Sequence, residues 1–185
     1  GMALGRWGEV GVLAVARMSM GAQLQVVGAL GPLLIGSLAA DWAALGSLIG
    51  AYSLAGIFVA LPAGMLLARF GDRPVLLAGV GLMGLGGIIL ALAPDFAVAI
   101  LGRLVSGVGG TLLTIAGAKM VLDRFTGPAV AMAMGMMLMA WPFGIGVALL
   151  VIPLFGEEWR WGLWWSAAFC SVAFILLVVS VRSSG

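Results

Sequence analysis

The sequence predicts an all-α membrane protein with six transmembrane helices, on the basis of its composition and its hydropathy pattern. Of 185 residues, 63% are hydrophobic and only 9% are charged, whereas soluble domains carry about 25% charged residues. Long apolar runs recur along the whole chain. A domain of this size would still expose much of its surface to water. We therefore expect the chain to lie in a lipid bilayer, which is the first of its expected partners.

Six segments are apolar enough to cross a bilayer, which takes about 20 residues in a helix. They are residues 10–38, 43–68, 74–93, 97–121, 128–152 and 161–181. The first segment is too long for a signal peptide and carries Arg17 in its middle, so we expect it to remain as a helix. We expect a single six-helix domain over residues 1–185.

The charges at the ends of the spans predict how the chain is oriented, because Lys and Arg are enriched in cytoplasmic loops. Arg160 is the single basic residue on one side, where the acidic residues are Asp41, Asp95, Glu157 and Glu158. The other side carries Arg6, Arg69, Arg73, Lys119, Arg124 and Arg182. We therefore expect a multi-pass protein of the cell (inner) membrane with both termini in the cytoplasm.

The composition excludes several classes of function. Histidine is absent and Cys170 is the only cysteine, which excludes histidine-based catalysis, an internal disulfide and a zinc cluster. No combination of nucleophile, base and metal ligands indicates an enzyme, and we expect no cofactor, no metal ion and no nucleic-acid partner. No Asp or Glu lies in the middle of a span, so the chain has no obvious proton carrier.

The first span contains a candidate binding site around Arg17. Helical periodicity places Arg17 and Gln25 on one face, whereas Gln23 points elsewhere. The planar fork of donors on arginine suits an anion, and an ionisable residue inside a membrane is by default a candidate functional residue. The alternative is that the long Arg17 side chain extends to the cytoplasmic surface.

The fourth span carries a narrow polar face that includes Arg103, Gly107, Gly110 and Thr114. A charge on the lipid-facing side would cost about 2.5–3.5 kcal/mol. Arg103 should therefore face protein or a watery cavity. Two interpretations stay open, because Arg103 can bind a solute together with Thr114, or it can bond helix ends as a structural residue.

The loop after the second span resembles the signature loop of the major facilitator superfamily. The matching positions are Gly64, Arg69, Gly71 and Arg73. Ala68 replaces the usual aspartate, and Asp72 replaces a basic residue. The resemblance implies a loop that latches two halves of a transporter through charge pairs, with Asp123 paired to Arg69 or Arg73. The alternatives are an ordinary cytoplasmic loop and a solvated Asp123.

The fifth span reads Trp141-Pro142-Phe143-Gly144, which is similar to the glycine-proline motif of the same superfamily in the variant where tryptophan precedes proline. Proline removes a backbone hydrogen bond and kinks a helix. The resemblance implies a bend that helps the domain rock during transport. The alternative is a kink that serves packing only.

Together these motifs identify the chain as similar to the N-terminal six-helix half of a major facilitator transporter, in a branch that resembles cyanate and nitrate/nitrite permeases. The resemblance implies a 3+3 inverted-repeat bundle and secondary transport of a small solute by alternating access. We expect an anion or another small polar solute. The residues implied to bind it are Arg17, Gln23, Gln25, Arg103 and Thr114.

A six-helix half implies a second half as partner, which is either a missing C-terminal half or a second copy of the chain in a homodimer. An alternative function also stays open. The chain is then a non-transporting membrane subunit or a homodimeric six-helix assembly protein, and its polar faces serve helix packing.

Overall fold

The structure is a computed structural model that describes residues 5–37 and 41–181. Six of its helices are long and apolar enough to cross a membrane, and the described residues contain no strand. The predicted all-α fold with six spans is thereby confirmed. Residue 38, the predicted end of the first span, and Arg182, which contributed to the predicted orientation, lie outside the described residues.

The six predicted spans overlap the six long helices in chain order. The elements are α1 (Arg6–Ala29), α2 (Gly31–Ser37), α3 (Trp42–Phe70), α4 (Asp72–Leu92), α5 (Phe96–Arg124), α6 (Pro128–Val151), the 3-10 helix η1 (Ile152–Phe155) and α7 (Trp159–Ser180).

The prediction of one continuous helix over residues 10–38 is wrong, because α1 ends at Ala29 and the short helix α2 begins at Gly31. Pro32 gives the physical reason. It has no N–H to donate to the carbonyl of Gly28, and its ring collides with that carbonyl in a continuous helix. The 24 residues of α1 still extend for about 36 Å, which is enough to cross a bilayer.

Short polar breaks set where the helices begin. Asp41 Oδ1 accepts a hydrogen bond from the Ala44 N–H at 2.7 Å, and Asp95 Oδ1 accepts one from the Val98 N–H at 3.0 Å. These side chains therefore cap the first turns of α3 and α5. Between α3 and α4, Gly71 has a φ of +85°, which glycine adopts without strain.

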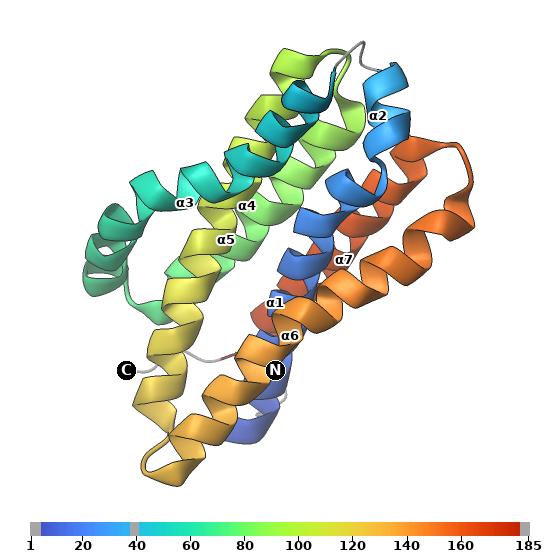
Figure 1. Ribbon diagram of the computed structural model, residues 1–185. Coiled ribbons are helices and arrows are strands. Elements are labelled where there is room, and N and C mark those ends of the chain that lie inside the picture. The colour runs from blue at the N-terminus through green and yellow to red at the C-terminus, as the bar shows by residue number, and fades with distance from the viewer. Residues whose placement is uncertain (1–4, 38–40, 182–185) are drawn as a thin grey trace.

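The helices pack as two related sets of three. α1 packs against α6 and α7, α5 packs against α3 and α4, and α4 contacts α7. The first three spans are α1, α3 and α4, and they correspond in order to α5, α6 and α7. Under this correspondence the α1–α6 contact is equivalent to the α5–α3 contact, and the α1–α7 contact is equivalent to the α5–α4 contact. A 3+3 repeat has this pattern of contacts. Figure 1 shows α3 and α6 on opposite sides, with α5 and α1 between them.

Glycines bring α4 and α5 into direct backbone contact. A Cβ atom on Gly79 would lie 2.8 Å from the carbonyl oxygen of Gly109, and one on Gly102 would lie 2.8 Å from that of Gly86. Small residues allow such close approach where lipid provides no hydrophobic drive for helix association. The glycine-rich composition is thus explained at this interface by helix packing.

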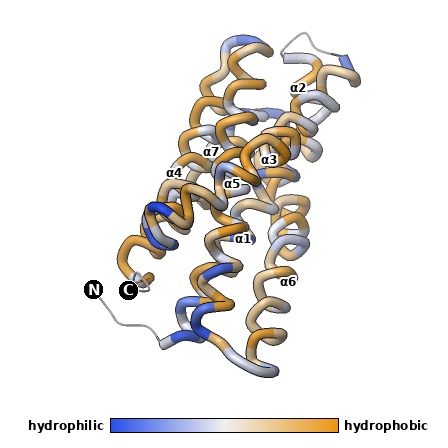
Figure 2. The backbone as a smooth tube through the Cα atoms, turned by 90° about the vertical axis from the view of Figure 1, so that its left-hand side faces the viewer, coloured by the Kyte–Doolittle hydropathy of each residue, from blue (hydrophilic) through white to orange (hydrophobic). Residues whose placement is uncertain are grey.

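The outer surface is apolar along the helices, and Figure 2 shows hydrophilic segments mainly near their ends. α3 and α6 have the smallest buried shares of the six spans. Their exposed side chains include Ile57, Phe58, Leu61, Met139 and Leu150.

Candidate functional site

Arg17 lies in the middle of α1, half-buried between α5 and α6. Its Nη1 atom donates a hydrogen bond to Thr114 Oγ1 at 2.8 Å, and its guanidinium carbon lies 5.2 Å from the centre of the Trp141 ring. Thr114 is ten residues before the end of α5 at Arg124. The guanidinium therefore stays within the span, and the structure brings together two of the residues predicted to bind solute.

The Arg17 guanidinium retains donors for a ligand. Thr114 Oγ1 donates its own hydrogen to the Gly110 carbonyl at 2.9 Å, and Met20 Sδ lies 3.7 Å from Arg17 Nη1. A guanidinium has five N–H donors. In the described part of the chain no carboxylate pairs with Arg17. Chemically, the arrangement offers one positive charge, a hydroxyl, a thioether and an aromatic face.

Arg103 is in a different environment, because its side chain is 0% exposed. Its Nε donates to the Leu48 carbonyl at 2.9 Å, Nη1 to the Gln23 carbonyl at 3.0 Å and Nη2 to the Leu24 carbonyl at 3.4 Å. Its guanidinium also lies 4.7 Å from the centre of the Tyr52 ring. All three nitrogens thus bind backbone of α1 and α3, which favours the structural interpretation of this arginine.

The two glutamines predicted to bind solute are also placed differently. Gln23 is 1% exposed, its Nε2 donates to the Met83 carbonyl at 2.7 Å, and its Oε1 accepts from the Tyr52 hydroxyl at 3.1 Å. Both ends of its amide are therefore bound between α1, α3 and α4. Gln25 is only partly buried, so its amide is the more accessible of the two.

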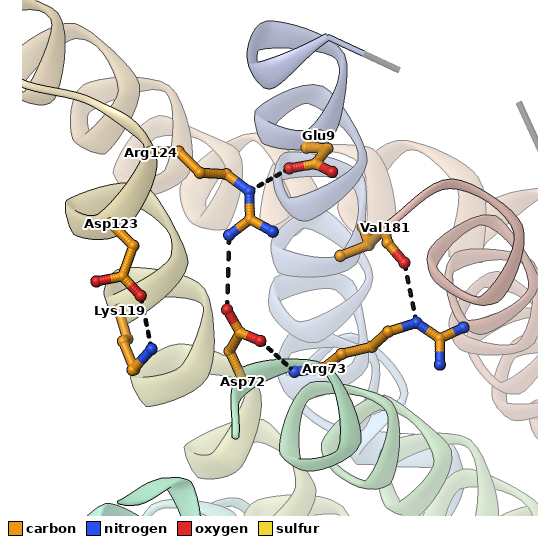
Figure 3. A network of polar contacts seen from close by, with 7 residues as sticks. All are labelled: Glu9, Asp72, Arg73, Lys119, Asp123, Arg124 and Val181. Carbon is orange, nitrogen blue, oxygen red and sulfur yellow. Dashed lines mark hydrogen bonds and ion pairs between the residues drawn. The ribbon is translucent and has the colours of Figure 1, made fainter. Parts of the chain in front are cut away.

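A polar network joins the helix ends where the signature loop lies, and Figure 3 shows its members. Arg124 at the end of α5 forms ion pairs with Glu9 of α1 and, at 3.5 Å, with Asp72 of α4. Asp72 Oδ1 also accepts from the Arg73 N–H at 2.7 Å. Arg73 Nε donates to the Val181 carbonyl just after α7 at 2.9 Å. The network ties together the ends of four helices.

The predicted pairing of Asp123 with Arg69 or Arg73 is wrong. Asp123 Oδ2 accepts instead from Lys119 Nζ at 2.6 Å, one turn earlier on the same helix, as residues four apart are neighbours on a helix face. Arg69 is exposed and lies over the ring of Phe70. The acids that the network does use are Asp72 and Glu9.

Sequence reasoning did not single out Glu9 or Arg124 for this network. The available signal is that Glu9 is an acidic residue on the side of the chain that is rich in arginine.

Of the glycines in the signature loop, Gly71 provides the turn, whereas a Cβ on Gly64 would meet no atom within 4 Å. The structure thus gives a local reason for Gly71 only.

The tryptophan-proline motif lies against α1 beside Arg17. α6 continues through Pro142, which is exposed. A Cβ on Gly144 would collide with the Met18 carbonyl, and one on Gly21 would collide with the Trp141 carbonyl. These two glycines therefore let the backbones of α1 and α6 meet at the level of Arg17, which places the Trp141 ring beside the guanidinium.

Comparisons with known proteins agree with this architecture. The sequence model of the Major Facilitator Superfamily matches residues 13–184. Among curated proteins, no sequence match was found.

Solved structures share the fold at low sequence identity. The inward-open xylose transporter XylE from E. coli is 16% identical with a TM-score of 0.82, over 97% of this chain and 49% of that one. A D-xylose-proton symporter is 18% identical with a TM-score of 0.79, over 96% and 48%. A POT family transporter in complex with 5-aminolevulinic acid is 15% identical with a TM-score of 0.80, over 92% and 37%. The chain thus spans about half or less of the length of these proteins.

Proposed function

Since this chain belongs to the major facilitator superfamily, we propose that it serves secondary transport of a small anion by alternating access. One observation carries the proposal of an anion. The Arg17 guanidinium lies inside the span, bonded to Thr114 and beside Trp141, with no carboxylate partner in the described residues. A buried charge is costly unless it is paired, and an anion supplies the pair.

In this proposal Arg17 binds the anion through its free N–H donors, because a guanidinium forms strong charge-assisted bonds to oxyanions. Thr114 orients the guanidinium, Trp141 covers one side of it, and the accessible amide of Gln25 adds a further donor. Cyanate, nitrate and nitrite are the first candidates, supported by the resemblance of the sequence to permeases for these anions. A single charged side chain at the site also suits a singly charged ligand.

The position of the acidic residues supports exchange of one anion for another. Glu9 and Asp72 are buried, but both lie at the helix ends and pair with Arg124. No described carboxylate lies in the middle of a span, where a proton relay would need one. Family membership likewise supports a transporter rather than an enzyme.

We further propose that the chain acts with a second six-helix unit in the cell (inner) membrane. Support comes from the solved structures, of which this chain covers 37–49%. The basic residues at the helix ends joined by the Arg124 network support a cytoplasmic location for that end and for both termini. The second six-helix unit can be either a second copy of the chain or a covalently continuous second half.

The first test measures anion binding by the purified protein. Nitrate, nitrite and cyanate are titrated while the tryptophan fluorescence is followed, because Trp141 lies at the site. A charged hydrogen bond is worth about 1.5–3 kcal/mol, so Arg17→Ala should weaken binding roughly tenfold or more. Arg17→Lys should bind with intermediate affinity. The matched control is Arg6→Ala, which removes one positive charge at the start of α1.

Equal binding by the wild type and Arg17→Ala would overturn the anion site. Uptake of labelled anion into proteoliposomes then tests transport itself. The alternative of a non-transporting assembly subunit is supported by the broad apolar faces of α3 and α6. Its polar faces serve helix packing, so it predicts no uptake of the anion. Thr114→Val distinguishes the two functions, because in a transporter it should reduce both anion affinity and uptake without changing how the protein assembles.

A further inference from the structure

A polar cavity lies at the end of the bundle opposite the Arg124 network. It has a volume of about 350 Å³ and is lined by Glu158, Arg160, Trp161 and Trp164 at the start of α7. Trp161 is 60% exposed. The transport site described above uses none of these residues. The cavity thus combines an acid, a base and two indole rings at the membrane boundary.

The two charges in this cavity are held differently. Arg160 Nη1 donates to the Ala91 carbonyl at 2.6 Å, and Nη2 donates to the Ala93 carbonyl at 3.2 Å. These bonds fix the guanidinium at the seam between α7 and the end of α4, and leave it further N–H donors. Glu158 precedes α7, but its side chain makes no capping hydrogen bond. Its carboxylate is therefore available to a ligand.

A separate apolar groove lies between α4 and α7, further along α7 from this cavity. It has a volume of about 330 Å³, and its lining includes Gly81, Gly84 and Ile88 of α4 and Ser171 and Ile175 of α7. Ser171 and Ile175 follow Trp164 by seven and eleven residues, which places all three on one face of α7. Eleven residues extend over about 16 Å, comparable to much of a lipid acyl chain.

We propose that this α4–α7 seam binds one phospholipid with a zwitterionic, ammonium-bearing headgroup. The phosphate is recognised by Arg160. The ammonium group lies between the Glu158 carboxylate and the indole rings of Trp161 and Trp164, which attract cations through their faces. One acyl chain lies in the groove beside Gly81 and Gly84, where the absence of side chains makes room for it.

The charges argue for this ligand over two related ones. An anionic lipid without an ammonium group leaves Glu158 without a partner and places negative charge beside it. A soluble zwitterion of the same chemistry leaves the apolar groove empty. Tryptophans at a membrane boundary anchor many helices without specific binding, and that general role predicts no dependence on Glu158.

The experiment compares retention of two lipids by the purified protein in native mass spectrometry. Phosphatidylethanolamine and phosphatidylglycerol with identical acyl chains are supplied at equal concentration. The wild type should retain one phosphatidylethanolamine with about tenfold preference, as one charge-assisted contact of about 1.4 kcal/mol distinguishes the two lipids. Glu158→Gln should reduce the preference to about twofold or less. Glu157→Gln is the matched control and should retain the wild-type preference.

Gly84→Leu tests the groove, because its side chain fills the space beside Ser171 and should reduce retention of both lipids. Circular dichroism verifies that each variant is folded. Equal retention of the two lipids by the wild type, or equal effects of Glu157→Gln and Glu158→Gln, would overturn the proposal. Displacement of the lipid by soluble phosphoethanolamine at similar concentration would overturn the assignment to a lipid.

Discussion

Arg17 of α1 and Arg103 of α5 lie at corresponding places in the two sets of three spans. Each arginine is followed four residues later by a glycine, Gly21 or Gly107. Each glycine allows a close approach to the backbone of the neighbouring helix, α6 for Gly21 and α3 for Gly107. The local arrangement of arginine, glycine and facing helix is therefore the same in both sets.

The facing residue is aromatic in both places, since Gly21 meets the Trp141 carbonyl and Gly107 meets the Tyr52 carbonyl. Each guanidinium lies over the ring of that aromatic residue. The difference lies in the remaining hydrogen bonds. Arg103 donates to three backbone carbonyls and is fully buried, whereas Arg17 donates through Nη1 to the Thr114 hydroxyl and the Met20 thioether and is half-buried. The Arg103 arrangement thus joins helices, whereas the Arg17 arrangement leaves N–H donors that the proposed anion would use.

The largest expected effect comes from truncating the two arginines. Arg103→Ala removes three hydrogen bonds and leaves a cavity in the core, so it should lower the free energy of unfolding by about 2–5 kcal/mol. Arg17→Ala should lower it by less than about 1 kcal/mol, because the loss of its one hydrogen bond to protein oxygen is offset by removal of a half-buried charge that has no carboxylate partner among the described residues. Unfolding in mixed micelles, followed by circular dichroism, measures both.

Arg6→Ala is the control for loss of charge alone and should leave the stability close to that of the wild type. The comparison fails if Arg17→Ala and Arg103→Ala destabilise the protein equally. Loss of anion binding in Arg103→Ala with an unchanged unfolding transition would assign the ligand-binding role to Arg103 in place of Arg17.

The next largest effect is expected at Gly21 and Gly107, and it tests whether these two glycines have equivalent roles in helix packing. In both Gly21→Ala and Gly107→Ala the new Cβ collides with a backbone carbonyl, so each should destabilise the protein by about 1–3 kcal/mol through overpacking. Gly64→Ala is the matched control, because a Cβ there meets no atom within 4 Å. Thermal unfolding in detergent measures all three variants. A large loss for one glycine and none for the other would show that the two places are not equivalent.

The sequence was sufficient for the six spans, because apolar length alone identifies a helix that crosses a bilayer. It also predicted a polar face around Arg17 and one around Thr114, because helical periodicity defines faces within a helix. Periodicity does not fix how far one helix is shifted along another. The pairs that depend on this shift, such as Arg124 with Glu9 and Arg103 with the Gln23 carbonyl, were therefore beyond sequence reasoning.

Two local features were missed for a related reason. The helix break before Pro32 follows from proline chemistry. The prediction of a single span over residues 10–38 was based on the length of the apolar run and did not take this break into account. Asp123 was expected to reach Arg69 or Arg73, and the nearer Lys119 on the same helix binds it instead. Contacts within one helix are formed without any dependence on tertiary packing.

A smaller effect distinguishes the two glutamines next to the arginines. Gln23→Ala removes one hydrogen bond to the Met83 carbonyl and one from the Tyr52 hydroxyl, so it should cost about 1–2 kcal/mol of stability. Gln25→Ala should leave stability nearly unchanged and weaken anion binding severalfold. The two readouts are the unfolding free energy and the fluorescence titration. Weaker anion binding in Gln23→Ala at unchanged stability would show that Gln23 takes part in binding the anion.

The smallest expected effect concerns the aromatic residue beside Arg103. Tyr52→Phe keeps the ring face under the guanidinium and removes the hydroxyl that donates to Gln23 Oε1 at 3.1 Å. Hydrogen bonds between membrane helices average about 0.6 kcal/mol, so the loss of stability should be of that size. Trp141→Phe, at the corresponding place beside Arg17, should instead shift the anion affinity. A change in anion affinity in Tyr52→Phe comparable to that in Trp141→Phe would contradict the division between a structural arginine and the proposed ligand-binding arginine, because the Tyr52 ring lies under the Arg103 guanidinium and the Trp141 ring lies beside Arg17.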